Sequence, residues 1–430
     1  VEYLHQQMMR TLLLFPLALC LAAGGTHPAF SADNKPSISW PGLLGKDRNG
    51  WVSGFTAPEK WPDKLGKTWQ LKVGAGYGSP LISGELVFLH TRQGENEAVR
   101  CLDLKTGKEK WQRAYPVPFR MGMGGERHGK GPKSCPVLAE GRLFTLSITG
   151  ILSAWDAQSG KLLWRRDYST EFKKNHPYWG TASSPIVDGD KLIVHMGNDK
   201  KGTLLALDVQ SGKEIWRQGK DGASYSSPLI VEIMGTRQVI QWNHEDLVGV
   251  SIDDGRLLWS HHAPHRTHNQ NMPTPVFHEG RILLGGENRG IQCLEPRLTG
   301  DRWEVKQLWH QEKVALDMST AVINNGLLYG MSHYKSGQFF CLKPKDGKVL
   351  WLSPGRVGNN VAFLSAPGHV IALINTGELR IIEASGKAYK QVASYPVADS
   401  PTWAPPLLLK EHVLVKSLDQ LTLWSLKGNG

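Results

Sequence analysis

Apolar and polar residues alternate in short runs along most of this chain, and the runs recur at similar intervals. An alternation of period two predicts β-strands with one buried face, and a polar turn ending in Gly predicts a hairpin. Each copy has a small residue, a strand, such a turn, a basic residue, and a second strand ending on Trp. The clearest copies are CLDLKTGKEKW (101–111), AWDAQSGKLLW (154–164), ALDVQSGKEIW (206–216), GVSIDDGRLLW (249–259) and CLKPKDGKVLW (341–351).

Two weaker copies extend the series. CLEPRLTGDRWEVKQLW (293–309) has a longer turn, and IIEASGKAYK (381–390) lacks its Trp. The turn glycines suit the positive φ of tight hairpins. We expect the small residue to leave room for a neighbouring sheet and the Trp to fill the gap between sheets. The structural Trp positions are Trp69, Trp111, Trp164, Trp216, Trp259, Trp309 and Trp351.

A second signature precedes most copies: Ser, Thr or Cys, then Pro, a few apolar residues, Gly and another strand. Instances begin at Ser79, Cys135, Ser184, Ser227 and Thr274. One unit therefore predicts four strands. The Trp positions lie 42 to 53 residues apart, which is typical of a blade in a β-propeller.

The two ends of the repeat complete one blade. Trp69 lies in a single outer strand, KTWQLKV (67–73), and the last segment (400–426) supplies strands but no outer one. Pairing them would close the ring and remove exposed sheet edges. The sequence thus predicts an all-β, eight-bladed β-propeller of four-stranded antiparallel blades over residues 67–430. A seven-bladed ring would require the degenerate stretch 352–399 not to be a blade.

The N-terminus predicts export. Residues 1–31 have the pattern of a signal peptide, with an apolar run from Thr11 to Ala23 and small residues at Ala29 and Ser31. Residues 32–66 are expected to be an extension that packs on the propeller. A lipoprotein is the alternative, with Cys20 lipidated, although Leu19 stands where a lipobox has a small residue. The sequence predicts no integral membrane segment.

The other four cysteines are widely spaced. Cys101, Cys293 and Cys341 stand at the small-residue position of the repeat, so we expect them to be packing residues rather than disulfide partners or catalysts.

The repeat resembles that of the PQQ-like repeat superfamily, which includes the quinoprotein alcohol dehydrogenases and the BamB family of outer-membrane assembly lipoproteins. The motif Ala-x-Asp-x-x-x-Gly-Lys-x-x-Trp matches at Ala154–Trp164 and Ala206–Trp216, and the resemblance covers residues 67–426. It implies the fold, while one propeller can serve many functions.

Long loops between an outer strand and the next inner strand are expected to surround one mouth of the central channel. Loops on a rigid scaffold commonly form binding sites. Packing between loops and ordinary solvation are the alternatives for these side chains. The candidate ligand-binding residues are Arg127, His128, Lys133, Tyr178, Trp179, Tyr225, His265, His268, Asp317 and Trp403.

Four histidines, His261, His262, His265 and His268, lie within eight residues and raise the question of a metal. No carboxylate or thiolate accompanies them in the loop, so the sequence alone predicts no metal site.

The formal charge is +11, but basic residues recur after each turn Gly. The repeat therefore spreads this charge around one rim, and with export this argues against a nucleic-acid partner.

Two functions are consistent with the resemblance. One is a non-catalytic, monomeric scaffold of the periplasm, or a secreted one, that binds a protein, peptide or polysaccharide of the cell envelope at the channel mouth. The other is a PQQ-dependent dehydrogenase with Ca²⁺ and an Asp base. The chain lacks the adjacent Cys pair of those enzymes. We therefore expect the scaffold, with no catalytic residue and no cofactor.

Overall fold

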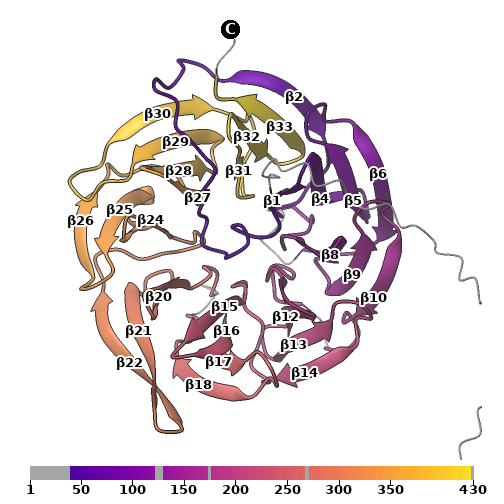
Figure 1. Cartoon of the computed structure of the whole chain (residues 1–430), viewed down its shortest axis with the longest axis vertical. Helices are drawn as coiled ribbons and strands as arrows, with labels where there is room; N and C mark the ends of the chain where they lie inside the picture. Colours follow the sequence, from indigo (N-terminus) through magenta and orange to yellow (C-terminus); the bar gives the residue numbers. More distant parts are fainter. Residues whose placement is uncertain (1–38, 122–128, 173–175, 267–270, 428–430) are drawn as a thin grey trace, which may run out of the picture. The chain divides into compact units, whose positions relative to one another are not determined.

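The computed structural model describes residues 39–121, 129–172, 176–266 and 271–427. The predicted signal peptide and Cys20 lie outside these residues. The described residues form eight antiparallel sheets arranged in a ring (Figure 1). Within each sheet the chain runs from the inner edge to the rim. Among the described residues no helix is long and apolar enough to cross a membrane.

Seven blades follow one another along the chain, numbered 1 to 7. Blade 1 consists of β3 (Leu81–Ser83), β4 (Leu86–Gln93), β5 (Asn96–Asp103) and β6 (Glu109–Pro116), and blade 2 of β7 (Val137–Ala139), β8 (Arg142–Leu146), β9 (Ile151–Asp156) and β10 (Leu162–Asp167). Blade 3 consists of β11 (Ile186–Asp188), β12 (Lys191–Gly197), β13 (Gly202–Asp208) and β14 (Glu214–Gln218), and blade 4 of β15 (Leu229–Ile233), β16 (Thr236–Trp242), β17 (Asp246–Ser251) and β18 (Leu257–His262). Blade 5 consists of β19 (Val276–His278), β20 (Arg281–Gly285), β21 (Ile291–Thr299) and β22 (Arg302–Gln311). Blade 6 consists of β23 (Val322–Asn324), β24 (Leu327–Ser332), β25 (Gln338–Lys343) and β26 (Lys348–Leu352), with the 3₁₀ turn η2 (Tyr334–Ser336) between β24 and β25. Blade 7 consists of β27 (Val361–Ala366), β28 (His369–Ile374), β29 (Glu378–Glu383) and β30 (Gln391–Pro396).

Blade 8 is built from both ends of the repeat. Strands β31 (Leu407–Leu408), β32 (His412–Lys416) and β33 (Gln420–Ser425) pair in order, and β2 (Gly66–Lys72) adds the outer strand next to β33. Trp69 is the partner of Leu423 in this pairing. The predicted ring closure and the count of eight blades are confirmed, and the stretch 352–399 contains blade 7.

Six of the seven repeat Trp residues reach the next blade, as predicted, whereas Trp259 donates to Gln238 of its own blade. The indole Nε1 of Trp164 donates to Val209 O of the next blade at 3.1 Å, and its ring lies against Gly212, whose φ is +66°. A Cβ at Gly212 would come within 2.6 Å of Trp164 Cδ2, so this Gly provides both the turn conformation and room for the neighbouring Trp. The same donation to the next blade is made by Trp69, Trp111, Trp216, Trp309 and Trp351.

The small residue of the repeat is the cross-strand partner of the Trp in its own blade, as in the pairs Ala154 with Trp164 and Cys341 with Trp351. It also packs in a cluster with residues of the next blade, as Ala154 does with Leu192 and Leu205. At Gly249 a Cβ would lie 2.2 Å from Trp259 Cε2. In blade 4 the space that Gly249 leaves is therefore used by the blade's own Trp259. The four described cysteines are all free and buried, in agreement with a packing role.

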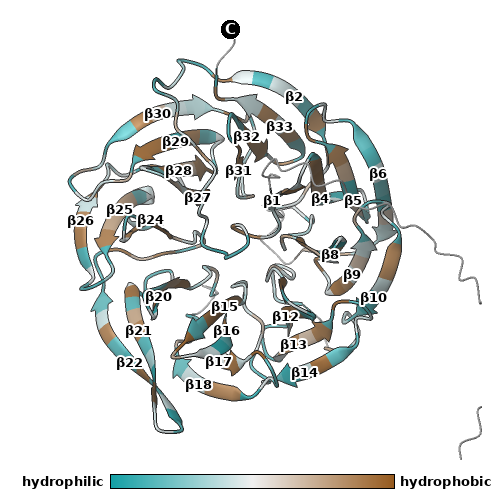
Figure 2. Ribbon diagram, in the orientation of Figure 1, coloured by the Kyte–Doolittle hydropathy of each residue, from teal (hydrophilic) through white to brown (hydrophobic). Residues whose placement is uncertain are grey.

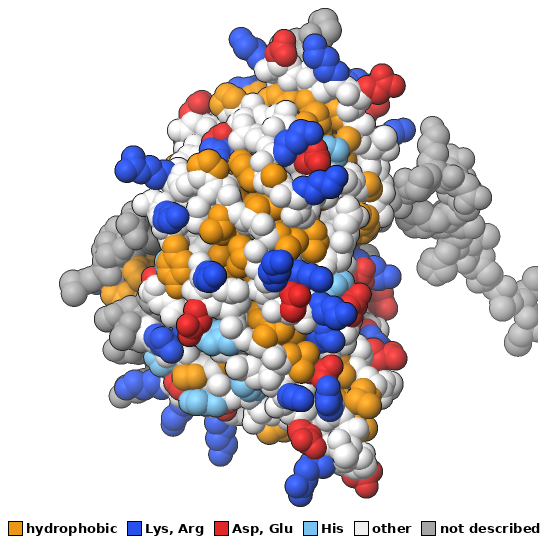
Figure 3. All heavy atoms as spheres, turned by 90° about the vertical axis from the view of Figure 1, so that its left-hand side faces the viewer, with side chains coloured by type: hydrophobic (Ala, Val, Ile, Leu, Met, Phe, Trp, Pro, Cys, Tyr) orange, Lys and Arg blue, Asp and Glu red, His pale blue; other side chains and the backbone are white. Residues whose placement is uncertain are grey.

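Hydrophobicity follows the layers of the ring (Figure 2). The second strand of blade 3, β12, is buried at six of seven positions, whereas the outer strand β14 is buried only at Trp216. On the face of the molecule in Figure 3, Lys and Arg side chains are interspersed with Asp and Glu. The net positive charge is thus not gathered into one basic patch on that face.

Residues 39–55, the N-terminal segment, run across the middle of the ring (Figure 1). Strand β1 (Ser39–Trp40) adds a fifth strand to the inner edge of blade 1. At the other end, Trp51 forms a parallel bridge with Ser365 of blade 7. Between these anchors the segment passes over the channel, and this position shapes the site described next.

Candidate functional site

A cavity of about 450 Å³ occupies the channel on the side of the long loops. We call it the central cavity. Every blade-to-blade connection contributes to its wall. Its lining includes Tyr77, Lys133, Cys135, Trp179, Ser184, Tyr225, Ser227, Met272, Thr274, Asp317, Ser319, Asn360 and Trp403, with Glu287 from a hairpin of blade 5. Leu43 and Leu44 of the N-terminal segment also line the cavity.

A ring of hydrogen bonds explains the Ser/Thr/Cys-Pro signature. Residues of this signature on successive blades join backbone N–H to side chain: Ser79 N donates to Cys135 Sγ at 3.0 Å, and Cys135 N to Ser184 Oγ at 2.9 Å. The series continues from Ser184 N to Ser227 Oγ, and from there to Thr274. These small polar side chains therefore bind neighbouring blades together around the cavity, and the fourth cysteine, Cys135, belongs to this ring.

Aromatic rings form much of the mouth. Tyr77 and Trp403 stack with centroids 5.3 Å apart, and Lys133 Nζ lies 4.6 Å from the Tyr77 ring centroid. Across the cavity, the Tyr225 hydroxyl accepts a hydrogen bond from Trp179 N at 2.8 Å. Flat, rigid side chains of this kind supply contact area at low conformational cost. The mouth is therefore suited to an apolar or planar group with polar edges.

Two charged side chains of the cavity titrate close to neutral pH. Burial, with a smaller contribution from the nearby Glu287 carboxylate, raises the pKa of Asp317 to about 7. Burial lowers the pKa of Lys133 to about 8. The cavity thus presents weakly solvated acid and base groups, whose charge a ligand can change on binding.

Arg48 holds the N-terminal segment beside the cavity. Its guanidinium is buried, donates to Pro228 O at 2.6 Å and Ser184 O at 2.9 Å, and also contacts Pro185 O. Burial lowers its pKa to about 9. Because Leu44 lines the cavity and Arg48 is bonded to carbonyls just before blades 3 and 4, the segment is anchored beside the cavity.

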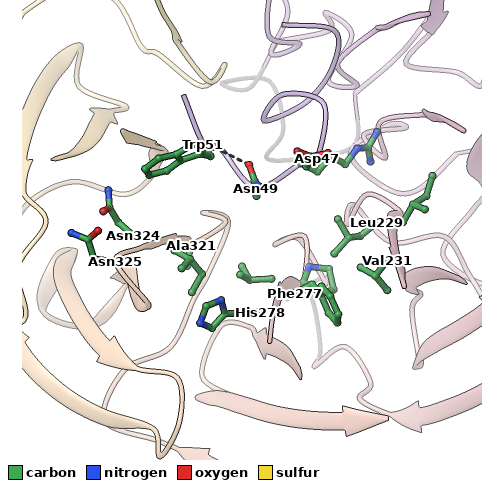
Figure 4. A pocket seen from close by; sticks show the side chains of 15 residues that line it. Asp47, Asn49, Trp51, Leu229, Val231, Phe277, His278, Ala321, Asn324 and Asn325 are labelled. Carbon is green, nitrogen blue, oxygen red and sulfur yellow. Dashed lines mark hydrogen bonds between the residues drawn. The ribbon is translucent and has the colours of Figure 1, made fainter. Parts of the chain in front are cut away.

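A second groove, of about 470 Å³, lies on the other side of this segment (Figure 4). Asp47, Asn49 and Trp51 form one wall, and the inner strands of blades 4, 5 and 6 form the rest, with apolar side chains such as Val231 and Phe277. Trp51 N donates to Asn49 Oδ1 at 2.9 Å. The N-terminal segment therefore lines two hollows of the channel, with Leu43 and Leu44 at the central cavity and Asp47 to Trp51 at the second groove.

The predicted site residues divide into three groups. Lys133, Trp179, Tyr225, Asp317 and Trp403 line the central cavity together. Tyr178 is exposed beside it and packs edge-on against the Trp179 ring at 4.8 Å. The positions Arg127, His128 and His268 lie outside the described residues.

His265 is not among the residues that line the central cavity. Its backbone N donates to His244 O in the β16–β17 turn, which draws it into a cluster with His244 and Glu245. Two other histidines of this stretch have polar partners of their own. His261 faces Gln292, and His262 pairs with Asp246.

Sequence reasoning missed several residues of the wall. Tyr77, Glu287 and Leu44 were not singled out, although Tyr77 directly precedes a Gly-Ser-Pro signature and so marks a channel-facing loop. Leu44 lies in the N-terminal segment, whose sequence has no periodic pattern that would predict its path through the ring.

Fold and site together define the chain as a PQQ-like repeat propeller. The family model described as outer membrane protein assembly factor BamB matches residues 95–353. The chain therefore belongs to this family.

Individual BamB proteins are similar to this chain at low sequence identity. The chain is 26% identical to the BamB of Yersinia pestis over 370 residues, covering 82% of this chain and 86% of that protein. It spans 64%, 55% and 36% of the BamB proteins of Moranella endobia, Shewanella oneidensis and Salmonella typhimurium.

Solved structures show the same fold. The BamB of Moraxella catarrhalis superposes with a TM-score of 0.60 at 14% identity, covering 85% of this chain and 99% of that one. A europium-containing methanol dehydrogenase superposes with a TM-score of 0.70 at 14% identity, covering 91% and 98%. At this identity both likenesses show the fold alone, so function has to be argued from the site.

Replacing Arg48 with Met should loosen the N-terminal segment. The change leaves several buried carbonyls without their donor, and we expect it to lower the free energy of unfolding by about 2–3 kcal/mol, since relief of the buried charge offsets part of the loss. Cys135, which faces both Arg48 and the cavity, should then react faster with a thiol reagent under native conditions. Denaturant midpoints and mass mapping of the labelled cysteine measure the two effects.

The matched control is Arg256→Met on the exposed rim, which should change neither value. If Arg48→Met left both the midpoint and the Cys135 labelling rate unchanged, the segment would not be held by these bonds.

Proposed function

We propose that this protein is a non-catalytic, exported scaffold that binds an extended polypeptide of the cell envelope in the mouth of the central cavity. The observation that carries the proposal is the cavity itself. All eight blades contribute to it, the N-terminal segment lines it, and aromatic rings form its mouth. Membership of a family described as an outer-membrane assembly factor supports an envelope protein or peptide over a polysaccharide as the partner. Location in the periplasm or outside the cell, and a monomeric state, belong to the same proposal.

The experiment uses a fluorescently labelled outer-membrane β-barrel polypeptide, diluted from urea into the purified protein and followed by anisotropy. The double variant Trp179→Ala/Trp403→Ala should bind at least about tenfold more weakly, because aromatic anchors at a binding centre each contribute about 2 kcal/mol or more. Leu162→Ala, an exposed apolar residue on the rim strand β10, is the control and should bind like the wild type.

Equal affinities for the wild type and the mouth variant would contradict the proposal. Competition by a soluble envelope polysaccharide, without binding of the polypeptide, would replace the peptide with the polysaccharide as the ligand.

A PQQ-dependent oxidoreductase is the second candidate, favoured by the buried Asp317 carboxyl in an aromatic cavity. The chain is also 24% identical over 227 residues to a quinohemoprotein alcohol dehydrogenase of Pseudomonas putida, covering 47% of this chain and 30% of that enzyme. The lining fits the cofactor poorly. PQQ carries three carboxylates, whereas this wall includes Lys133 together with two carboxyl groups, Asp317 and Glu287.

We therefore propose a scaffold that works without PQQ. Titration with PQQ and Ca²⁺ should leave the absorbance of the quinone unchanged. A saturable shift accompanied by dye reduction with an alcohol would establish the enzyme instead.

A further inference from the structure

Two histidines and a glutamate meet on blade 4, at the side of the central cavity. His244 and Glu245 lie in the turn between β16 and β17, and His265 follows β18. One potential ligand atom from each of the three lies within 4.8 Å of the others. The two segments are separate in sequence, so the fold assembles a group that the histidine-rich loop alone does not contain.

The ligand atoms converge on one carboxylate oxygen. His244 Nδ1 lies 3.2 Å from Glu245 Oε1, and His265 Nδ1 lies 3.1 Å from the same oxygen. His265 Nδ1 is buried, yet the direction of this contact does not make a hydrogen bond, and the atom has no hydrogen-bond partner among the described residues. A buried ring nitrogen of this kind is costly unless something else binds it.

These spacings suit a small transition-metal ion. Zn²⁺ binds imidazole nitrogen and carboxylate oxygen at about 2.0–2.2 Å in tetrahedral geometry, which places neighbouring ligand atoms roughly 3.4 Å apart. The observed nitrogen-to-oxygen distances are slightly shorter, so the three side chains have to move apart to admit the ion. Glu245 is 44% exposed at its side chain, which leaves a route for entry and a fourth position for water.

The two imidazole rings stack with centroids 3.5 Å apart and an interplanar angle of 27°. A metal ion lies close to the plane of each imidazole that binds it, so the two rings must turn relative to each other to bind the same ion.

The backbone around the cluster is held in place by hydrogen bonds. His265 N donates to His244 O at 2.9 Å, and Ala263 N donates to Glu245 O at 3.0 Å. Glu245 N donates to Asp221 Oδ2 at 2.9 Å, and Asn271 Nδ2 donates to His244 O at 3.1 Å. The backbone that carries the ligands is therefore already ordered, which favours binding because little conformational entropy is lost when the ion binds.

We propose that His244, Glu245 and His265 form a binding site for a divalent first-row transition-metal ion, with Zn²⁺ as the ion of choice. The site also touches the wall of the central cavity through Asn271, whose carbonyl accepts from Tyr225 N and Ser226 N. Metal binding would thus stiffen the connection that carries Tyr225, although the proposal does not depend on what the cavity binds.

The test uses the full chain after treatment with a chelator and dialysis. Calorimetric titration with Zn²⁺ should show one tight site per chain, and Co²⁺ should give the intense visible absorption of a tetrahedral complex. His265→Ala should weaken binding by at least about 100-fold, because even the loss of an outer partner of a metal ligand costs 10–100-fold. Glu245→Gln, which keeps the side-chain shape, should weaken it as well.

His262→Ala is the matched control, since this neighbouring histidine is exposed and pairs with Asp246. It should bind Zn²⁺ and Co²⁺ like the wild type. Melting curves without metal show whether each variant folds. The proposal is overturned if the wild type shows no saturable site, or if folded His265→Ala and Glu245→Gln proteins bind as tightly as the control.

Discussion

Replacing Trp164 with Ala is expected to lower the free energy of unfolding by about 3–5 kcal/mol, the range of other large-to-small core substitutions. Trp164 is 9% exposed, and its ring packs against Phe144 at 5.8 Å. Its ring also covers Gly212 of the next blade, and its Nε1 is bonded to Val209 O. The substitution therefore opens a cavity between two blades and leaves a buried carbonyl without its donor.

Denaturant midpoints of the wild type and the variant measure this loss. Trp179→Ala is the matched comparison, because Trp179 lies at the mouth and is only partly buried. Its replacement should cost much less. Losses of similar size for the two variants would mean that the mouth loop is packed as tightly as the space between blades.

His195 should make the protein sensitive to acid. It lies on β12, is 1% exposed, and burial lowers its pKa to about 3. The pKa in the unfolded chain is about 6.5, so the unfolded state takes up the proton first as the pH falls. The stability of the fold is then complete above about pH 6.5 and decreases by about 1.4 kcal/mol per pH unit as the pH falls towards 3.

The variant His195→Leu removes this titration from a site whose cross-strand partner is Leu204. Between pH 7 and pH 4 the wild type should lose about 3 kcal/mol more than the variant. Urea midpoints at a series of pH values measure the difference. His262→Leu, at an exposed histidine, should follow the wild type, and parallel curves for His195→Leu and the wild type would show that His195 is not responsible.

The architecture could be predicted in detail because the residues that determine packing recur in each copy of the repeat. The Gly that turns the hairpin and the Trp that covers the next blade recur with little change, as at Gly212 and Trp164. Local geometry and inter-blade packing are thus specified by the same few residues. The ring closure followed from one further fact, that the Trp69 strand lacks partners before it in the chain.

The candidate site could be predicted only in part. Lys133, Trp179, Tyr225, Asp317 and Trp403 were expected at one mouth, because they lie in loops whose position the blade pattern already determines. His265 lies in such a loop as well, but a backbone hydrogen bond joins it to His244, and it is not among the residues that line the cavity. No pattern along the chain encodes that bond.

The sequence by itself determined the class of fold, the number of blades, the closure of the ring and the side on which the long loops gather. Only the tertiary structure decided that Arg48 anchors the N-terminal segment across the channel, that this segment lines two hollows, and that His244, Glu245 and His265 come together. The physical reason is the range of the interactions. A repeated hairpin is encoded by residues about ten positions apart, whereas Arg48 reaches carbonyl oxygens 136 to 180 residues away, and such contacts exist only once the ring has formed.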